Sequence, residues 1–181
     1  MTDAHSLVAA IRKDVSLQAH DRGWARAFEQ ERDRLHACLP GVFVAIEHIG
    51  STVVAGLMAK PVIDLMAGVE SLQDADALVD RVCDNGYTTS HELNATLTDR
   101  RWLMRWHDGH RTHHLHIVVM DGAPWRDRLA FRDALRGDPA LARRYAELKS
   151  VLAARYQADR EAYTDAKAAF VIAVTAARRS S

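Results

Sequence analysis

The arrangement in this chain most suited to chemistry is a Gly-Ser pair followed by a single carboxylate in an apolar run. Gly50 and Ser51 follow a short apolar run, and Asp64 lies inside a second one, at residues 62–69. Glycine lets backbone amides approach a phosphate closely, and the start of a following helix favours an anion. A carboxylate among apolar neighbours needs a metal ion, a cation or a hydrogen-bond donor, since an unpaired buried charge is costly. The two features predict a turn that binds phosphates beside a strand that holds acid for a metal.

The second acid of such a site is missing. Side chains alternate along a strand, so Met66 projects on the same face as Asp64, where nucleotidyltransferase-type sites place another metal carboxylate. One acid alone is a poor platform for two metal ions. Glu47 or His48 could supply the missing ligand, but alternation directs only one of them into the site. The alternative is structural: the Gly-Ser pair is a plain strand-to-helix turn, and Asp64 only caps a neighbouring turn.

A histidine cluster is the second candidate for chemistry. Six of the ten histidines fall between His91 and His116, and His114 and His116 share one face of a predicted strand. This spacing can bind a metal or serve acid–base chemistry. The alternative is a surface cluster. We expect His116 to be the less exposed of the pair because an apolar run follows it.

Cationic residues could collect phosphates or carboxylates around Asp64. Lys60 precedes the Asp64 strand and could neutralise a phosphate as a point charge. The predicted C-terminal helices carry further candidates in rows: Arg128, Arg132 and Arg136, then Lys149, then Arg160 and Lys167. Basic residues on helices are more often solvated or paired with acids. The pattern therefore matters only if these helices face the Asp64 strand.

The elements that must position these residues divide the chain into three stretches. Residues 1–40 read as helical, and Pro40-Gly41 ends that stretch. The sheet region, 41–120, contains predicted strands at 42–46, 62–69, 103–106 and 114–120, a helix at 72–83 and a turn at 107–110. Helices fill 124–178, and Asp138 is expected to cap the second of them. Without repeats or a linker, 181 residues predict one domain, 1–181.

Composition excludes several classes of function. The 24 basic and 24 acidic residues balance, so the basic footprint of a nucleic-acid-binding protein is missing. No apolar run approaches the ~18 residues of a membrane span, and the polar N-terminus is not a signal peptide. Cys38 and Cys83 lie far apart and read as reduced thiols. We expect a cytoplasmic protein with a small-molecule or nucleotide ligand, no nucleic acid and no membrane; the oligomeric state is not indicated.

Five segments together resemble the GrpB family, also called UPF0157, of nucleotidyltransferase-like proteins. They are EHIGSTVVAGLMAKPVIDLMAGV, HHLHIV, FRDALR, RYAELK and REAYTDAK, and the likeness runs from about Trp24 to the last helix. It implies an α/β fold with a nucleotidyltransferase-like mixed β-sheet, flanking helices and a C-terminal helical portion. It places Gly50, Ser51, Lys60, Asp64, His116, Arg132, Lys149, Tyr163 and Lys167 on motif positions. Family members fused to dephospho-CoA kinase hint at nucleotide or coenzyme A chemistry.

We therefore expect an enzyme that binds a divalent metal, Mg or Mn or a softer ion, and ATP or another nucleoside triphosphate. It would transfer a nucleotidyl or phosphoryl group to a small metabolite, or activate a carboxylate for ligation. The expected catalytic residues are Asp64, Lys60 and His116. The expected phosphate-binding residues are Gly50, Ser51, Thr52, Arg132, Arg136, Lys149, Tyr163 and Lys167. The expected metal ligands are Asp64, His116, His114 and Glu47.

Two alternatives stay open. The first is a non-catalytic module that binds a nucleotide or a coenzyme A-related molecule and has lost the second acid. The second is a metal-dependent enzyme without a nucleotide, built on His114, His116 and Asp64.

Overall fold

Five strands form one mixed β-sheet in the order β1-β2-β5-β4-β3. The protein was analysed as a computed structural model that describes residues 16–179. The strands are β1 (Ala45–Ile49), β2 (Ile63–Val69), β3 (Tyr87–Thr88), β4 (Arg100–His107) and β5 (His110–Val119). Strands β2 and β5 run parallel, and the other three pairs are antiparallel.

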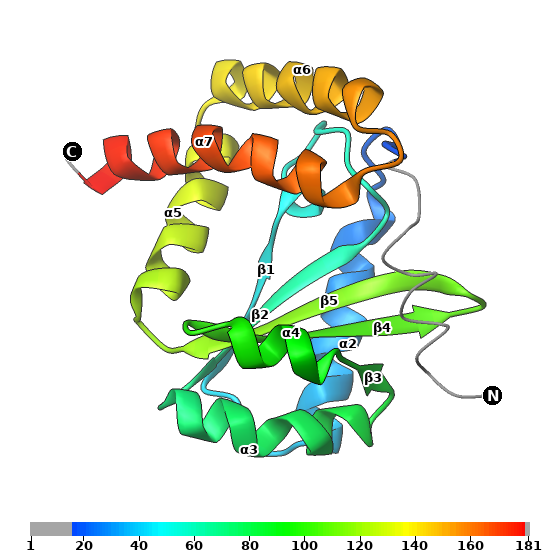
Figure 1. Ribbon diagram of the computed structural model, residues 1–181, viewed down its shortest axis with the longest axis vertical. Helices are drawn as coiled ribbons and strands as arrows, with labels where there is room; N and C mark the ends of the chain where they lie inside the picture. Colours follow the sequence, from blue (N-terminus) through cyan, green and yellow to red (C-terminus); the bar gives the residue numbers. More distant parts are fainter. Residues whose placement is uncertain (1–15, 180–181) are drawn as a thin grey trace.

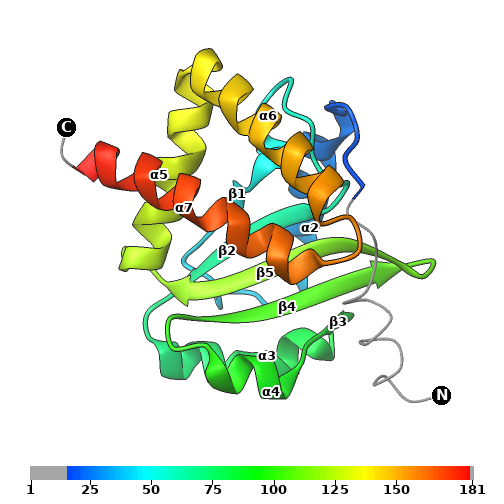
Figure 2. The same ribbon diagram turned by 45° about the horizontal axis from the view of Figure 1, so that its top comes forward.

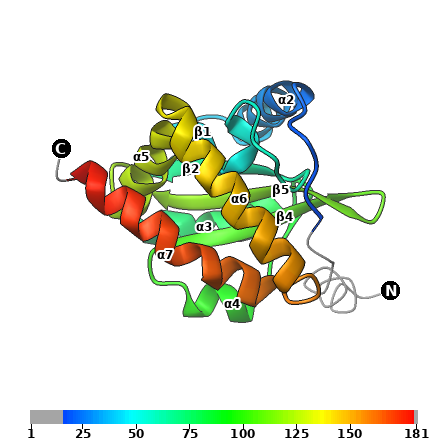
Figure 3. The same ribbon diagram turned by 90° about the horizontal axis from the view of Figure 1, so that it is seen from above.

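Helices lie on both sides of this sheet. They are α2 (Gly23–Cys38), α3 (Leu72–Cys83), α4 (His91–Thr96), α5 (Ala123–Gly137), α6 (Pro139–Arg155) and α7 (Arg160–Arg179). In Figure 1, α6 and α7 lie above the sheet and α3 lies below it. Helix α5 contacts β1 and β5 (Figure 2), and Figure 3 shows α6 and α7 crossing over the sheet. The predicted α/β class, with a mixed sheet and flanking helices, is confirmed.

The main core lies between the sheet and helices α2 and α3. Alternate residues of the central strands point into it, among them Leu65, Leu103 and Leu115, which are fully buried. At its edge Glu31 of α2 is buried and accepts hydrogen bonds from Arg34 at 2.6 Å and from the hydroxyl of Tyr87 at 2.7 Å. This face of the sheet is therefore filled, and any site must lie on the other face.

The register of the strands sets the composition of that other face. Asp64 of β2 lies opposite His114 of β5, which lies opposite Met104 of β4. Two residues further along β2, the next row is Met66, His116 and Trp102. Helices α5, α6 and α7 close over these rows, so the C-terminal helices do face the Asp64 strand.

Local sequence signals explain where several elements begin and end. Asp138 caps α6 as predicted, because its carboxylate accepts from the amides of Ala140 at 2.9 Å and Leu141 at 3.0 Å. Asp108 and Gly109 both have positive φ in the two-residue turn that joins β4 to β5. The first strand begins and ends three residues later than predicted, because its pairing with β2 runs from Ala45, opposite Gly68, to Ile49, opposite Asp64. The short elements β3 and α4 were not predicted.

Candidate functional site

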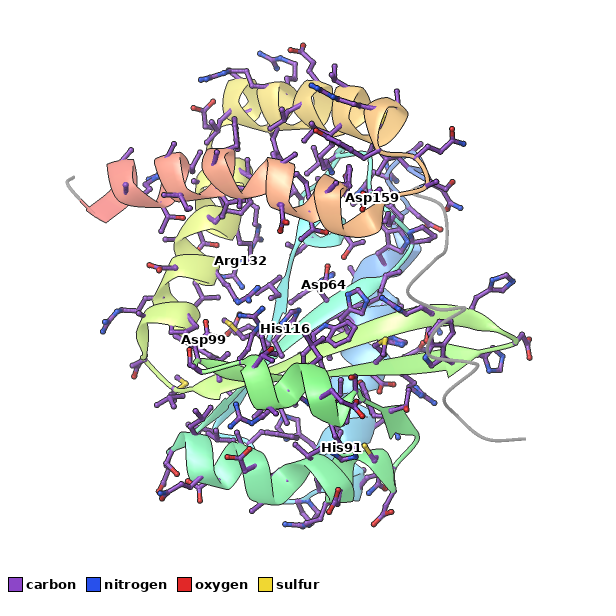
Figure 4. All side chains as sticks on the ribbon, in the orientation of Figure 1. Asp64, His91, Asp99, His116, Arg132 and Asp159 are labelled. Atoms are coloured by element: carbon purple, nitrogen blue, oxygen red, sulfur yellow. The ribbon has the colours of Figure 1, made fainter. Side chains whose placement is uncertain are left out.

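A cavity of about 910 Å³ lies between the second face of the sheet and the C-terminal helices. Strands β2, β4 and β5 form its floor, and α4, α5, α6 and α7 contribute to its walls. The lining includes the predicted site residues Gly50, Ser51, Thr52, Lys60, Asp64, His114, His116, Lys149, Tyr163 and Lys167. Residues far apart in the sequence thus line one cavity, and Figure 4 shows two of them, Asp64 and His116, close together below the C-terminal helices.

Asp64 is held at the centre of the floor by a hydrogen bond from His114. The distance from His114 Nδ1 to Asp64 Oδ1 is 2.8 Å, and the Asp64 side chain is 27 % exposed. Burial alone would raise the pKa of Asp64, but the hydrogen bond from His114 and nearby positive charge, including that of Lys167, hold it below its usual value. The carboxylate stays ionised at any physiological pH, so it suits charge stabilisation better than general-base catalysis.

Gly50 is required beside this carboxylate. Its φ is 76°, in the left-handed region, and a Cβ on Gly50 would overlap Asp64 Oδ2 and lie 3.1 Å from Asp64 Cγ. The Gly-Ser turn therefore packs directly on the acid.

The turn leads into only one turn of 3₁₀ helix, Ser51–Val53. The prediction that Ser51 and Thr52 open a helix is wrong beyond this single turn, while phosphate binding by these two residues stays a prediction. Thr52 is buried, and its hydroxyl is 2.9 Å from His48 Nε2. His48 in turn stacks on Phe28 of α2, with ring centroids 4.7 Å apart. This pair supports the turn from behind, and Ser51 is the residue that faces the cavity.

His114 is not available as a metal ligand in this arrangement. Its Nε2 lies 3.1 Å from Nη1 of Arg111, and a guanidinium can only donate. Nε2 must therefore accept, and Nδ1 carries the proton that is shared with Asp64. Both ring nitrogens have partners, so the predicted pairing of His114 with His116 as metal ligands does not fit this arrangement.

His116 differs from its neighbour because its Nδ1 is buried without a hydrogen-bond partner among the described residues. Burial lowers the pKa of His116 well below the usual value, and the charge of Arg128 lowers it further. The ring is neutral at pH 7. In Figure 4 it lies between Asp64 and Asp99.

The described residues do not fit a two-metal centre. Met66 is fully buried and packs with Ile49, Val118 and Trp125, so an apolar side chain occupies the position of the second carboxylate. Within residues 16–179, no group of three or more His, Cys, Asp or Glu side chains is placed to hold a metal ion. Asp64 stands as a single carboxylate with a histidine partner.

Three lysines surround two tyrosines in the upper wall of the cavity. Lys60 and Lys167 lie over the ring of Tyr163, with Nζ 4.7 Å and 4.4 Å from its centroid. Lys149, which is 2 % exposed, lies 5.1 Å from the ring centroid of Tyr145 and donates to the carbonyl of Met58. Burial and the charge of Lys167 lower the pKa of Lys149 to about 7. The four lysines of the chain thus include three that line this cavity.

Three of the predicted site residues lie apart from the cavity lining. Glu47 and Arg132 pair with each other, with Nη1 of Arg132 2.7 Å from Oε2 of Glu47, so neither is directed at a ligand. Arg136, one turn further along α5, is also outside the lining. The basic ridge on α5 turns only Arg128 toward the cavity. The side chain of Arg160 lies outside the described residues.

Several lining residues were missed in the sequence analysis, among them three from the β4–β5 hairpin. Arg100, Trp102 and Arg111 come from β4 and β5, and Arg111 lies 5.5 Å from the ring centroid of Trp102. The turn at Asp108-Gly109 located the hairpin in the sequence, but a β-bulge between Arg105 and Trp106 shifts which of its residues oppose His114 and His116.

With this geometry established, comparison with known proteins identifies the family. A sequence model described as GrpB protein matches residues 14–177. The chain belongs to the GrpB family. Among its relatives, the glutamate-rich protein GrpB of Alkalihalophilus pseudofirmus is 34 % identical over 173 residues, covering 91 % of this chain and 96 % of the relative.

Other GrpB relatives differ in length. A UPF0157 protein of Pseudomonas aeruginosa is 40 % identical over 151 residues, which cover 81 % of this chain and 60 % of the relative. A dephospho-CoA kinase of Mycolicibacterium paratuberculosis is 30 % identical over 189 residues, which cover 91 % of this chain and 46 % of the kinase. The family domain therefore also occurs within larger proteins.

A solved structure shares this GrpB fold. The crystal structure of the conserved protein GrpB from Enterococcus faecalis has a TM-score of 0.79 and 34 % identity, covering 90 % of this chain and 96 % of that one. Within residues 16–179, no helix is long and apolar enough to cross a membrane.

Proposed function

We propose that this chain binds a nucleoside triphosphate in the cavity and transfers a nucleotidyl or phosphoryl group to a small metabolite, or activates a carboxylate for ligation. One observation carries the proposal: Lys60, Lys149 and Lys167 converge beside the Gly-Ser turn, next to the ionised Asp64. Other cations of the chain are nearly all arginines. Lysines concentrated in one cavity give compact point charges that suit the several oxygens of a polyphosphate.

The roles follow from position. Ser51 and the three lysines would hold phosphate oxygens and neutralise charge that develops during transfer. The Asp64–His114 pair would orient the reacting end of the ligand, with the carboxylate fixed in one rotamer by the histidine. His116, neutral and one row further along the floor, would accept a hydrogen bond from the second substrate.

A metal enters the proposal only as the Mg²⁺ or Mn²⁺ that accompanies nucleotide phosphates. Among the described residues, Asp64 is the one carboxylate on the floor strands, and no group of acids and histidines is placed to hold a resident metal ion. No catalytic step of the proposal depends on the ion.

Calorimetric titration with ATP tests the proposal directly. We expect the wild type to bind, and Lys167→Met and Lys60→Met each to bind about tenfold or more weakly, because each variant removes a charge-assisted contact. Arg143→Met is the matched control, since this exposed arginine of α6 lies outside the cavity lining. Equal affinity in all four proteins would exclude nucleotide binding at the lysines.

A non-catalytic binding module is the second candidate, and Met66 favours it. This buried methionine removes the second carboxylate on which two-metal transfer depends. The relatives named dephospho-CoA kinase make a coenzyme A-related nucleotide a reasonable ligand to include. Tight binding of ATP or dephospho-CoA without turnover, across metals and a panel of small acids and amines, would favour the module over the enzyme.

The metal-dependent enzyme without a nucleotide is the weakest of the three. It requires His114 and His116 as a ligand pair, and His114 already shares both nitrogens with Asp64 and Arg111.

A further inference from the structure

Two guanidinium groups gather at the end of the cavity away from the lysines. Arg100 begins β4, and Arg128 projects from the first half of α5; both line the cavity. Nη1 of Arg100 donates to Asp99 at 2.9 Å, but its Nε is buried without a partner among the described residues. No hydrogen bond or ion pair to Arg128 is found within residues 16–179.

The local field at this end is positive. Burial lowers the pKa of Arg128, and the charge of Arg100 lowers it further. The carboxylates of Asp64 and Asp99 act in the opposite direction without cancelling these effects. Asp127, the neighbour of Arg128 on α5, also lines the cavity. A partly buried cation with incomplete compensation is costly for the empty protein, and an anionic ligand would remove that cost.

The strand register separates this end from the lysines. Arg100 lies opposite Val118, which lies opposite Gly68 of β2. Gly68 is four residues beyond Asp64 on the same strand, which corresponds to ~13 Å. Lys60 lies before β2 begins, on the other side of Asp64. The cavity therefore has a lysine end and an arginine end, with the Asp64–His114 pair between them.

Apolar side chains flank the arginine end. Trp102 lies on the floor, one row from Arg100, and Leu93 and Leu97 of the α4 region and Pro124 of α5 form the walls. Leu93 is 42 % exposed, so its apolar side chain is accessible from the cavity. Such walls suit the apolar body of a small molecule whose charged group is bound by the guanidinium groups.

We propose that Arg128 and Arg100 bind the oxyanion, carboxylate or phosphate, of an acidic small molecule whose apolar part lies against Trp102 and Leu93. This acidic small molecule would be the second substrate of the transfer reaction, a role that rests on the proposed function, in which the nucleotide occupies the lysine end. A planar guanidinium binds carboxylate and phosphate oxygens in a bidentate manner, which a lysine cannot do.

Three probes of similar size test this site in the full chain: benzoate, phenyl phosphate and the neutral benzyl alcohol. We expect one or both anions, and not the alcohol, to bind the wild type in calorimetric titration. Arg128→Met should weaken that binding about tenfold or more, and Arg128→Lys should restore part of it. Arg126→Met, an exposed position on the same helix, is the matched control. Tighter binding of benzoate assigns the site to a carboxylate, and tighter binding of phenyl phosphate assigns it to a phosphate ester.

Thermal unfolding without ligand adds a readout that a structural arginine would not give. Because Arg128→Met removes an uncompensated charge, the variant should unfold at the same temperature as the wild type or higher. A lower unfolding temperature together with unchanged binding of both anions would overturn the proposal. So would failure of both anions to bind the wild type.

ATP binding separates this inference from the proposed function. Arg128→Met should bind ATP with the affinity of the wild type, since ATP would occupy the lysine end. An equal loss for ATP and for the aromatic anions would place Arg128 in the nucleotide site and overturn the second site. Anion binding through Arg128 in a protein that never binds ATP would uphold the oxyanion site and refute the nucleotide function.

Discussion

At the scale of single residues, the contact between Gly50 and Asp64 couples the turn to the acid. Gly50→Ala would combine backbone strain at a φ of 76° with overlap between its Cβ and the Asp64 carboxylate. We expect the free energy of unfolding to fall by about 2–4 kcal/mol, the sum of the strain of a non-glycine residue in this positive-φ, extended conformation and a forced side-chain shift. Urea titration measures the loss.

Gly56 provides a matched control for this prediction. Its φ is 75°, but a Cβ there would meet nothing within 4 Å. Gly56→Ala should therefore cost only the strain, about 1–2 kcal/mol. If the two variants lose equal stability, the contact with Asp64 contributes nothing.

Lys149 predicts a pH dependence of ligand binding at the same scale. Its pKa of about 7 means that it is mainly protonated at pH 6 and mainly neutral at pH 8. His48 and His116 have lowered pKa values and stay neutral across this range. The affinity of the wild type for ATP should therefore weaken by roughly tenfold from pH 6 to pH 8 relative to Lys149→Met. Comparing the two proteins at each pH removes the titration of ATP itself; parallel pH profiles would exclude Lys149 from the site.

The structure changes the pH dependence that we expect for any activity in which His116 takes part. If His116 had the ordinary histidine pKa of about 6.5, it would become protonated below that pH, and an activity that needs the neutral ring would be lost. His116 is buried beside Arg128, and its pKa is well below that value. Any activity that depends on neutral His116 should thus persist to lower pH than the sequence alone predicts.

At the scale of elements, Arg132 fastens α5 to β1. Its Nη1 donates to Glu47 at 2.7 Å and to the carbonyl of His48 at 3.2 Å, and its side chain is 13 % exposed. Arg132→Ala should lower the free energy of unfolding by about 1–3 kcal/mol, because it leaves these acceptors without their donor. Affinity for ATP should stay within about twofold of the wild type, which corresponds to less than ~0.5 kcal/mol, because Arg132 lies outside the cavity lining. Calorimetry on the folded variant would reverse this assignment if it found a large loss.

The strand register explains which site residues could be predicted from the sequence. Asp64, His114 and His116 were identifiable because each lies in an apolar run, and the period of two fixes their shared face. Arg100 and Trp102 were harder to place. A β-bulge between Arg105 and Trp106 shifts the hairpin pairing by one residue, which exchanges the two faces of the strand. Only the folded sheet shows that they belong to the cavity.

The helical rows were less predictable for a different reason. A four-residue repeat puts Arg128, Arg132 and Arg136 on one ridge, but a helix that crosses the end of a cavity presents only part of that ridge to it. The packing angle of α5 decides the rest, and that angle depends on Trp125 and the buried cluster with Met66. Glu47 was likewise a plausible metal ligand until its partner Arg132 was placed.

At the scale of the whole molecule, the two layers have different tasks. The layer of α2, α3 and the sheet contains the main apolar core, and the layer of α5, α6 and α7 supplies Lys149, Lys167 and Arg128 to the cavity. Neutral histidines sit at the boundary of the layers. His48 stacks on Phe28 beneath the turn, and His113 lies beside the buried Glu31.

These histidines predict that the protein loses stability in mild acid. Burial lowers the pKa of His48 and of His113 to about 4, against 6.5 in the unfolded chain. As the pH falls from 6.5 to 4, protons bind the unfolded chain in preference, so the free energy of unfolding decreases over that window. The stabilisation is fully present above pH 6.5. For His48 alone the loss approaches about 3 kcal/mol at the lower end.

Urea titrations at several pH values between 7.5 and 4.5 measure this loss. The lower limit of this pH range avoids protonation of the buried Glu31, because its pKa in the folded protein is lowered from 4.5. His48→Gln can keep a hydrogen bond to Thr52 but cannot be protonated, so its stability should decline less steeply with falling pH. His107→Gln is the control, because the His107 side chain is 80 % exposed and should not affect the slope. A wild type whose stability is constant from pH 6.5 to pH 4.5 would mean that His48 and His113 are accessible to protons in the folded protein. The packing between the turn and α2 would then be looser than the stacked rings indicate.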